Sequence, residues 1–172
     1  MVSRKICLLG DFSVGKTSLV RRFVHEVYDD RYVTTLGVKI ETKEVALPDG
    51  SVKLVIWDME GTGSEKAGDD LVTPRMKAYL QGVNGVLIVA DGTRKATVET
   101  ALELHRWLET EYPGLPSVLM LNKADLEDEW KLSGEDIDGL PDTLHSFTTS
   151  ALSGDNVEDT FMYFAQELKS QA

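Results

Sequence analysis

Short runs of apolar residues recur along this chain and are separated by polar or amphipathic stretches. A strand that is covered on both faces is apolar at nearly every position, so these runs predict buried strands. They lie at residues 5–9, 85–90 and 117–121, and a last strand is expected near residues 144–149. Residues 38–47 instead alternate apolar and charged side chains, and the turn Pro48-Asp49-Gly50 leads from them into a further strand at 51–57. The latter two strands predict a hairpin.

Apolar side chains recur at helical spacing in three other segments of the chain. The first segment covers residues 16–28. The second covers residues 98–108 and ends near Tyr112. The third follows Asn156, which is its predicted N-cap. Strands therefore alternate with helices, and the sequence predicts an α/β fold with a mostly parallel six-stranded sheet, one antiparallel edge hairpin and helices on both faces.

A glycine-rich turn joins the first strand to the first helix and fits the Walker A pattern. It reads Gly10-Asp11-Phe12-Ser13-Val14-Gly15-Lys16-Thr17. The N–H groups of such a loop point inward at a phosphate, Lys16 brings a charge to the β- and γ-phosphates, and the Thr17 hydroxyl can bind Mg²⁺. Asp58 ends a later apolar strand, which is the Walker B arrangement beside that ion. A chance glycine turn explains the flanking strand and helix less well.

A second motif, Asn122-Lys123-Ala124-Asp125, directly follows the apolar strand at residues 117–121. The carboxyl ends of strands line the ligand crevice of such sheets. A carboxylate at Asp125 can accept two hydrogen bonds from the N1–H and the amino group of guanine. Adenine offers no such pair and would leave the carboxylate desolvated and unpaired. The motif therefore predicts specificity for guanine.

With these motifs in this order, the sequence resembles the Ras superfamily of small GTPases, and looks closest to its Rab-like branch. Thr35, the segment from Asp58 to Gly61, and Ser150-Ala151 also follow the family's order and spacing. Leu36-Gly37-Val38 looks Rab-like in particular. The resemblance covers nearly the whole chain, so a single G-domain is expected over residues 1–172.

The resemblance implies a P-loop NTPase that acts as a switch: it binds GTP or GDP with Mg²⁺ and hydrolyses GTP to GDP. The implied metal ligands are Thr17, Thr35 and Asp58. The residues implied in hydrolysis are Lys16, Thr35, Gly61 and Thr62. The implied nucleotide-binding residues are Ser13, Val14, Gly15, Lys16, Thr17, Ser18, Tyr28, Asp30, Tyr32, Thr35, Gly61, Asn122, Lys123, Asp125, Ser150, Ala151 and Leu152. Tyr28 would pack on the guanine ring.

The sequence departs from the family around hydrolysis. Thr62 stands where the family has a glutamine that orients the attacking water, and a Thr hydroxyl is shorter. Phe12 fills a position that is usually small in the phosphate loop. The second switch, the loop that follows Asp58, is also longer than usual when it is counted from Asp58 to Gly82. These departures predict slow intrinsic hydrolysis, which Glu60 or an arginine in cis (Arg31 or Arg75) would offset. The alternative is a pseudo-GTPase scaffold that holds GTP or GDP with little or no hydrolysis. A small-metabolite kinase is disfavoured, because it leaves the guanine motif unexplained.

Composition limits the partners and the compartment. The formal net charge of −11 makes nucleic acid and anionic membranes poor partners. No apolar run is long enough to cross a membrane, and the chain carries no lipidation motif. Cys7 is the only cysteine, which favours a reducing, cytoplasmic location. The family resemblance implies that effector, exchange and activating proteins bind through residues 30–40 and 59–75.

Overall fold

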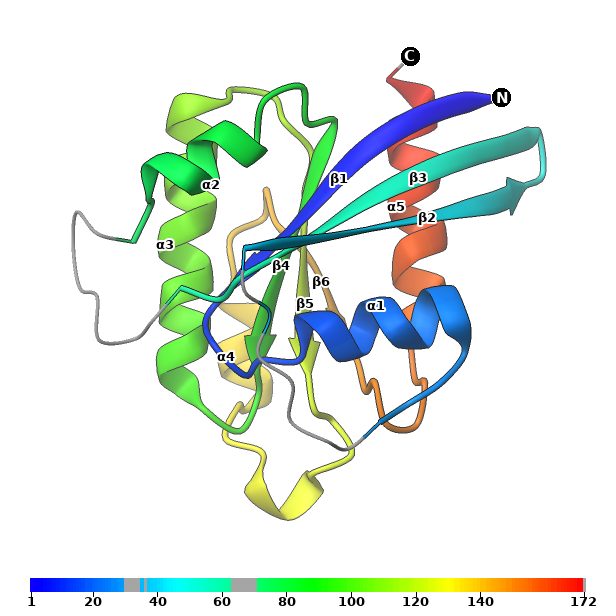
Figure 1. Cartoon of the computed structure of the whole chain (residues 1–172). Coiled ribbons are helices and arrows are strands. Elements are labelled where there is room, and N and C mark those ends of the chain that lie inside the picture. The colour runs from blue at the N-terminus through cyan, green and yellow to red at the C-terminus, as the bar shows by residue number, and fades with distance from the viewer. Residues whose placement is uncertain (30–34, 36, 63–70, 172) are drawn as a thin grey trace.

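The computed structural model describes residues 1–29, 35, 37–62 and 71–171. A six-stranded sheet in the order β2-β3-β1-β4-β5-β6 forms its centre (Figure 1). Only β2 and β3 pair antiparallel; the other neighbouring strands are parallel. The strands are β1 (Val2–Gly10), β2 (Val38–Leu47), β3 (Gly50–Met59), β4 (Gly85–Asp91), β5 (Ser117–Asn122) and β6 (His145–Thr148). The predicted sheet, with its one antiparallel edge hairpin, is confirmed.

Helices cover both faces of the sheet, as predicted (Figure 1). They are α1 (Lys16–His25), α2 (Pro74–Tyr79), α3 (Lys95–Glu111), the short 3-10 helix η2 (Glu127–Glu129), α4 (Gly134–Asp138) and α5 (Val157–Ser170). Side chains of β1 alternate between two cores. Ile6 and Leu8 pack with α1 and α5, whereas Cys7 and Leu9 pack with α2 and α3. Because both faces are buried, β1 is apolar along its central run.

The helices differ in detail from the predictions. Helix α1 ends at His25 rather than at residue 28, because Glu26 takes a left-handed conformation (φ 57°) and donates its N–H to the carbonyl of Arg22. Asn156 occupies the N-cap position of α5, as predicted, but it is left-handed and its side chain donates to the Thr148 carbonyl (2.8 Å) without a side-chain cap bond to the helix. The short helices α2, η2 and α4 were not predicted.

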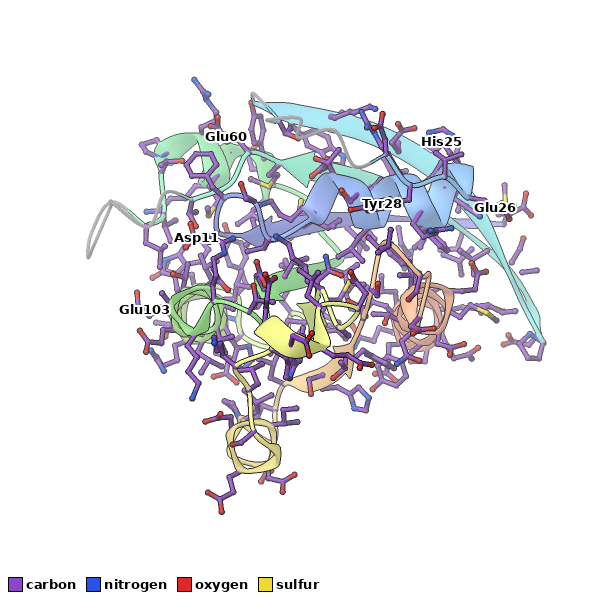
Figure 2. The ribbon with its side chains drawn as sticks, turned by 90° about the horizontal axis from the view of Figure 1, so that it is seen from below. Asp11, His25, Glu26, Tyr28, Glu60 and Glu103 are labelled. Carbon is purple, nitrogen blue, oxygen red and sulfur yellow. The ribbon has the colours of Figure 1, made fainter. Side chains whose placement is uncertain are left out.

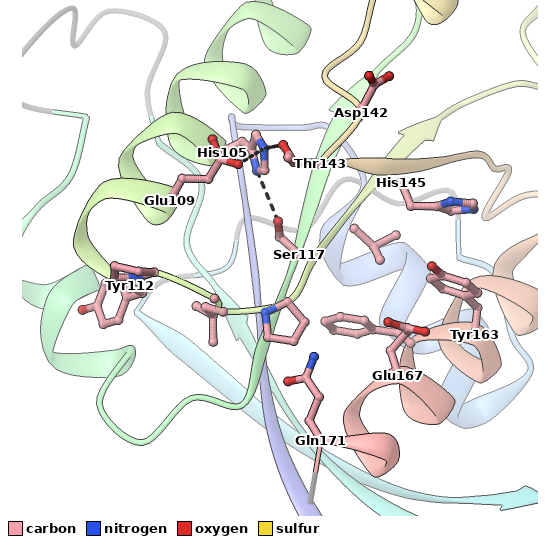
Figure 3. A pocket seen from close by; sticks show the side chains of 16 residues that line it. His105, Glu109, Tyr112, Ser117, Asp142, Thr143, His145, Tyr163, Glu167 and Gln171 are labelled. Carbon is pink, nitrogen blue, oxygen red and sulfur yellow. Dashed lines mark hydrogen bonds and ion pairs between the residues drawn. The ribbon is translucent and has the colours of Figure 1, made fainter.

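The edge of the sheet where β5 and β6 begin carries a pocket of about 550 Å³ (Figure 3). His105 of α3 lies on its wall and is almost completely buried. Its Nδ1 lies 3.2 Å from the Ser117 hydroxyl and its Nε2 3.1 Å from the Thr143 hydroxyl. Glu109 approaches the same Nε2 to 3.4 Å. Burial lowers the pKa of His105, against the opposing effect of Glu109 and with a smaller contribution from Arg106.

This buried histidine makes a pH-dependent contribution to stability. The unfolded chain takes up a proton on His105 as the pH falls below about 6.5, whereas the folded chain resists it. Acidification through that value is therefore expected to lower the free energy of unfolding. His105→Gln should reduce the fall of the unfolding temperature between pH 7.5 and 5.5, measured by circular dichroism. His25→Gln, at an exposed position on α1, is the control, and equal slopes for the two variants would contradict the prediction.

No helix in the described part of the chain is long and apolar enough to cross a membrane.

Candidate nucleotide-binding site

The predicted phosphate loop lies at the carboxyl edge of the sheet, between β1 and α1. Figure 2 looks onto this edge and labels Asp11 in the loop. Gly10 and Gly15 both have positive φ (154° and 101°), so both favour glycine. A Cβ at Gly10 would stand 2.3 Å from the Val89 carbonyl oxygen, and one at Gly15 would stand 2.3 Å from Asn122 Nδ2. The loop is thus packed between β4 and the base motif without space for a side chain at either glycine.

Lys16 lies inside this loop with 6% of its surface exposed. Its Nζ donates to the carbonyl oxygens of Gly10 (3.1 Å) and Asp11 (2.9 Å). Burial lowers the pKa of Lys16 to about 8, although the carboxylates of Asp58 and Asp11 oppose the shift. A buried ammonium with this lowered pKa is stabilised by added negative charge, which a phosphate group supplies.

Three oxygen-bearing side chains meet beside Lys16. The Thr17 hydroxyl donates to Asp58 Oδ2 (2.6 Å) and lies 2.6 Å from the Thr35 hydroxyl. Asp58 is buried, and its Oδ1 accepts no hydrogen bond from any described residue. Burial raises the pKa of Asp58, against the hydrogen bond from Thr17 and the charge of Lys16. Hydroxyl and carboxylate oxygens are the ligands that Mg²⁺ prefers, so this cluster, with its unpaired buried oxygen, fits that ion.

The start of the second switch is attached to the phosphate loop. Thr62 forms an isolated parallel bridge with Asp11, in which Thr62 N–H donates to the Gly10 carbonyl (3.0 Å) and Phe12 N–H donates to the Thr62 carbonyl (3.1 Å). Thr62 is buried, and its hydroxyl also donates to the Gly10 carbonyl (3.3 Å). A Cβ at Gly61 would come within 2.7 Å of the Phe12 Cα. The backbone at Gly61 therefore rests directly on the phosphate loop.

The Phe12 ring is 42% exposed and lines a pocket of about 140 Å³ between the end of β3 and helix α2. Met59, Leu71 and Met76 supply apolar walls to this pocket. Phe12 thus adds an apolar ring where the phosphate loop faces the second switch.

The base motif is held by a separate set of hydrogen bonds. Asn122 Nδ2 donates to the Val14 carbonyl (3.0 Å), while Asn122 Oδ1 accepts from the Thr149 hydroxyl and the Ala151 N–H (both 3.3 Å). The Ser150 hydroxyl donates to Asp125 Oδ1 (2.7 Å). One amide side chain at the end of β5 thereby fixes the phosphate loop and the loop after β6 to one another. Ser150 orients Asp125 from the same loop.

The remaining predicted ligands lie around this edge. Tyr28 is 39% exposed and Leu152 is also exposed, and the Leu152 carbonyl accepts a hydrogen bond from Arg22. Ser13 takes a left-handed conformation (φ 59°), as does Lys123 (φ 71°). Ser18 lies in the first turn of α1. Asp30 and Tyr32, and Arg31 with them, lie outside the described residues, so their predicted roles are not placed.

Sequence reasoning missed three residues of this region. Asp91 ends β4 with 1% of its surface exposed and binds Lys123 Nζ (3.0 Å) and Arg94 Nε (3.0 Å). Arg94 in turn donates to the Phe12 carbonyl (2.8 Å). Trp130 packs on Gly92, where a Cβ would stand 2.0 Å from the ring. An acidic residue that ends a buried strand was the available signal for Asp91, as it was for Asp58.

Comparison with known proteins places the chain in one family. The model of the Ras family matches residues 5–170. GTP-binding protein YPT1 of Saccharomyces cerevisiae is 34% identical over 173 residues, which cover 96% of this chain and 78% of that protein. Ras-related protein RABF2a of Arabidopsis thaliana is 33% identical, with 97% and 82% covered, and Ras-related protein Rab-13 of Bos taurus is 29% identical, with 95% and 79% covered. The chain therefore belongs to the Ras family of small GTPases, and its relatives are of the Rab type.

Proposed function

We propose that this chain is a Mg²⁺-dependent guanine-nucleotide switch whose intrinsic hydrolysis of GTP is slow. The observation that carries the proposal is the position of Thr62: its hydroxyl is hydrogen-bonded to the phosphate-loop carbonyl of Gly10, while the Thr17 hydroxyl lies 2.6 Å from oxygens of both Thr35 and Asp58, the three side chains that would hold Mg²⁺. The site thus combines intact binding chemistry with a weak means of orienting water.

Binding rests on residues from both ends of the site. Lys16 and the N–H groups of its loop would bind the phosphates, and Asp125 would accept hydrogen bonds from guanine. Thr17, Thr35 and Asp58 would hold Mg²⁺, which supplies charge neutralisation at the β- and γ-phosphates. In this scheme Thr35 of the first switch and Gly61 of the second switch would contact the γ-phosphate, so that both loops are ordered only when GTP is bound. We extend this assignment to a single G-domain over residues 1–172.

Slow hydrolysis follows from two side chains. A water-orienting residue must reach the attacking water in line with the γ-phosphate. The Thr62 hydroxyl is short, buried and engaged with Gly10, so it is poorly placed to accept or hold that water. The exposed ring of Phe12 stands beside Gly61 and narrows the approach for an arginine supplied by a partner.

Two of the residues predicted to offset this loss, Glu60 and Arg75, already bind other groups. Arg75 forms an ion pair with Glu60 (3.1 Å), and the other carboxylate oxygen of Glu60 accepts from Gly37 N–H (3.3 Å). Glu60 N–H also donates to the Gly37 carbonyl (2.8 Å). Glu60 therefore links the two switches and is not free to act as a base, while Arg75 is turned toward it.

The contacts between Glu60 and Gly37 hold together the two segments that we expect partner proteins to bind. Residues 30–40 and 59–75 would bind effector, exchange and activating proteins, and Ile40 is half exposed on the edge strand β2. The net charge of −11 argues against nucleic acid as a partner, and the single cysteine, Cys7, favours a reducing, cytoplasmic location.

A pseudo-GTPase scaffold is the second candidate. The hydrogen bond from the Thr62 hydroxyl to Gly10 favours this candidate as well, because a nucleotide that stays bound without being hydrolysed can act as a fixed structural ligand. The two candidates differ only in whether GTP is turned over.

The proposal is tested by titrating the nucleotide-free protein with fluorescent GTP, GDP and ATP in the presence of Mg²⁺. We expect GTP and GDP to bind and ATP to bind far more weakly, and chelation of Mg²⁺ with EDTA to speed nucleotide release. Equal affinities for GTP and ATP would contradict the guanine assignment. Release that is indifferent to EDTA would contradict the metal cluster.

A further inference from the structure

Arg94 makes a side-chain link between the turn after β4 and the phosphate loop, in addition to the backbone pairing of β1 with β4. It occupies the N-cap position of α3, in the turn after β4, and 42% of its side chain is exposed. Its Nε donates to Asp91 Oδ2 (3.0 Å), and its terminal Nη2 donates to the Phe12 carbonyl (2.8 Å). The guanidinium therefore bridges a buried carboxylate and the phosphate loop.

Asp91 carries the bridge onward to the base motif. The carboxylate oxygen that accepts from Arg94 also lies 3.0 Å from Lys123 Nζ. The other oxygen accepts from the N–H (2.8 Å) and the hydroxyl (2.6 Å) of Thr93. Burial raises the pKa of Asp91, but the hydrogen bonds from Thr93, Lys123 and Arg94 outweigh it and hold the pKa below its usual range. Asp91 is thus a stable anion with two cations on one oxygen.

Arg94 binds the phosphate loop at Phe12, the residue that also contacts Thr62 of the second switch. Phe12 receives Arg94 on its carbonyl and donates its N–H to the Thr62 carbonyl (3.1 Å). The same N–H lies 2.8 Å from Asp11 Oδ1. Any shift of Arg94 is therefore transmitted to the phosphate loop at the point where the second switch is attached.

We propose that Arg94 is a positioning residue that, through Asp91, ties the phosphate loop to the base motif at residues 122–125 and slows the release of bound nucleotide. The inference rests on the proposed function. A nucleotide contacts both loops, so it leaves when they separate. Arg94 opposes that separation without contacting the nucleotide itself.

The geometry requires arginine rather than any cation. The guanidinium donates from two nitrogens in a fixed fork, one to a carboxylate and one to a carbonyl. A lysine ammonium is a single point charge on a flexible stem, and it would have to satisfy both acceptors from one atom. Charge-assisted hydrogen bonds are about twice as strong as neutral ones, and partial exposure of Arg94 reduces that gain.

The experiment measures the rate at which bound fluorescent GDP leaves the full chain when excess unlabelled GDP is added. We expect Arg94→Ala to speed release about five- to tenfold, the effect of losing one partly exposed charge-assisted pair. Arg94→Lys should recover part of the wild-type rate. Arg106→Ala removes the same charge from an exposed position further along α3 and should change the rate less than about twofold.

A coupled measurement separates positioning from mere stability. Arg94→Ala and Asp91→Asn should not add in the double variant, because both break one network. Release from Arg94→Ala and Arg94→Lys at the wild-type rate would overturn the inference, as would additive effects. If Arg94→Ala does not fold, accelerated release from Arg94→Lys carries the test. Failure of the wild-type chain to bind GDP would instead reject the proposed function.

Discussion

Asp125→Asn is expected to lower the affinity for GTP by roughly 10³-fold or more, because a site built around hydrogen bonds strongly rejects a ligand that mismatches them. In the proposed site the carboxylate would accept from two guanine donors, whereas an Asn side chain would present its NH₂ group to one of them. Xanthine carries a carbonyl oxygen where guanine has its amino group, so it can accept from that NH₂. The variant should therefore gain affinity for xanthosine triphosphate while it loses affinity for GTP.

The structure indicates that this change leaves the local fold intact. Asp125 is only half-buried, and its Oδ1 accepts from the Ser150 hydroxyl, a bond that the carbonyl oxygen of Asn can keep. Asp128→Asn, an exposed position on η2, removes the same charge and serves as the control. Equilibrium titration with fluorescent GTP and xanthosine triphosphate compares the variants. Unchanged GTP affinity in Asp125→Asn would reject the base assignment.

The sequence predicted those parts of the site that are continuous in the chain. The phosphate loop and the base motif each occupy consecutive residues between a strand and a helix, so their geometry follows from local conformation. Gly10 and Gly15 could be picked out in the sequence because their positive φ angles favour glycine over other residue types. Thr17, Thr35 and Asp58 come from three separate segments: the Walker patterns predicted Thr17 and Asp58 at one ion, whereas only the family resemblance added Thr35 before the structure placed their oxygens in contact.

Contacts between distant segments left no such signature. Arg94 and Phe12 are 82 positions apart, and the bond is to a backbone carbonyl, which any residue carries. Helices α2 and α4 have only six and five residues, too few for a helical period to be counted. Ser133 and Asp136 form a capping box at α4, which was a usable signal. Asn156 is the N-cap of α5, as its residue type predicted, but its left-handed backbone conformation and missing side-chain cap bond could not be predicted, because asparagine is common in both settings.

Thr62→Gln is expected to raise the single-turnover rate of GTP hydrolysis about ten- to a hundredfold, which is at or below the lower end of the roughly 10²–10⁴-fold that one well-placed group contributes, because the loop around the new side chain is not built to orient it. Thr62 occupies a buried slot beside Gly10 that fits a short side chain. A Gln side chain is longer, so it should leave this slot and project toward the place where the γ-phosphate and the attacking water meet. Its amide can both accept from and donate to that water.

Thr62→Ala is the matched control, since it removes the hydroxyl without adding a longer group. If the Thr62 hydroxyl is occupied by Gly10, Thr62→Ala should hydrolyse GTP at about the wild-type rate, measured by rapid quench on preloaded protein. A large loss in Thr62→Ala would show that the hydroxyl takes part in hydrolysis and would contradict the proposed detuning. Absence of turnover in the wild type and in Thr62→Gln, with GTP still tightly bound, would favour the scaffold. Thr62 would then be one of several obstacles, and the ring of Phe12 beside Gly61 would be the next to remove, because it adds bulk between the phosphate loop and the second switch.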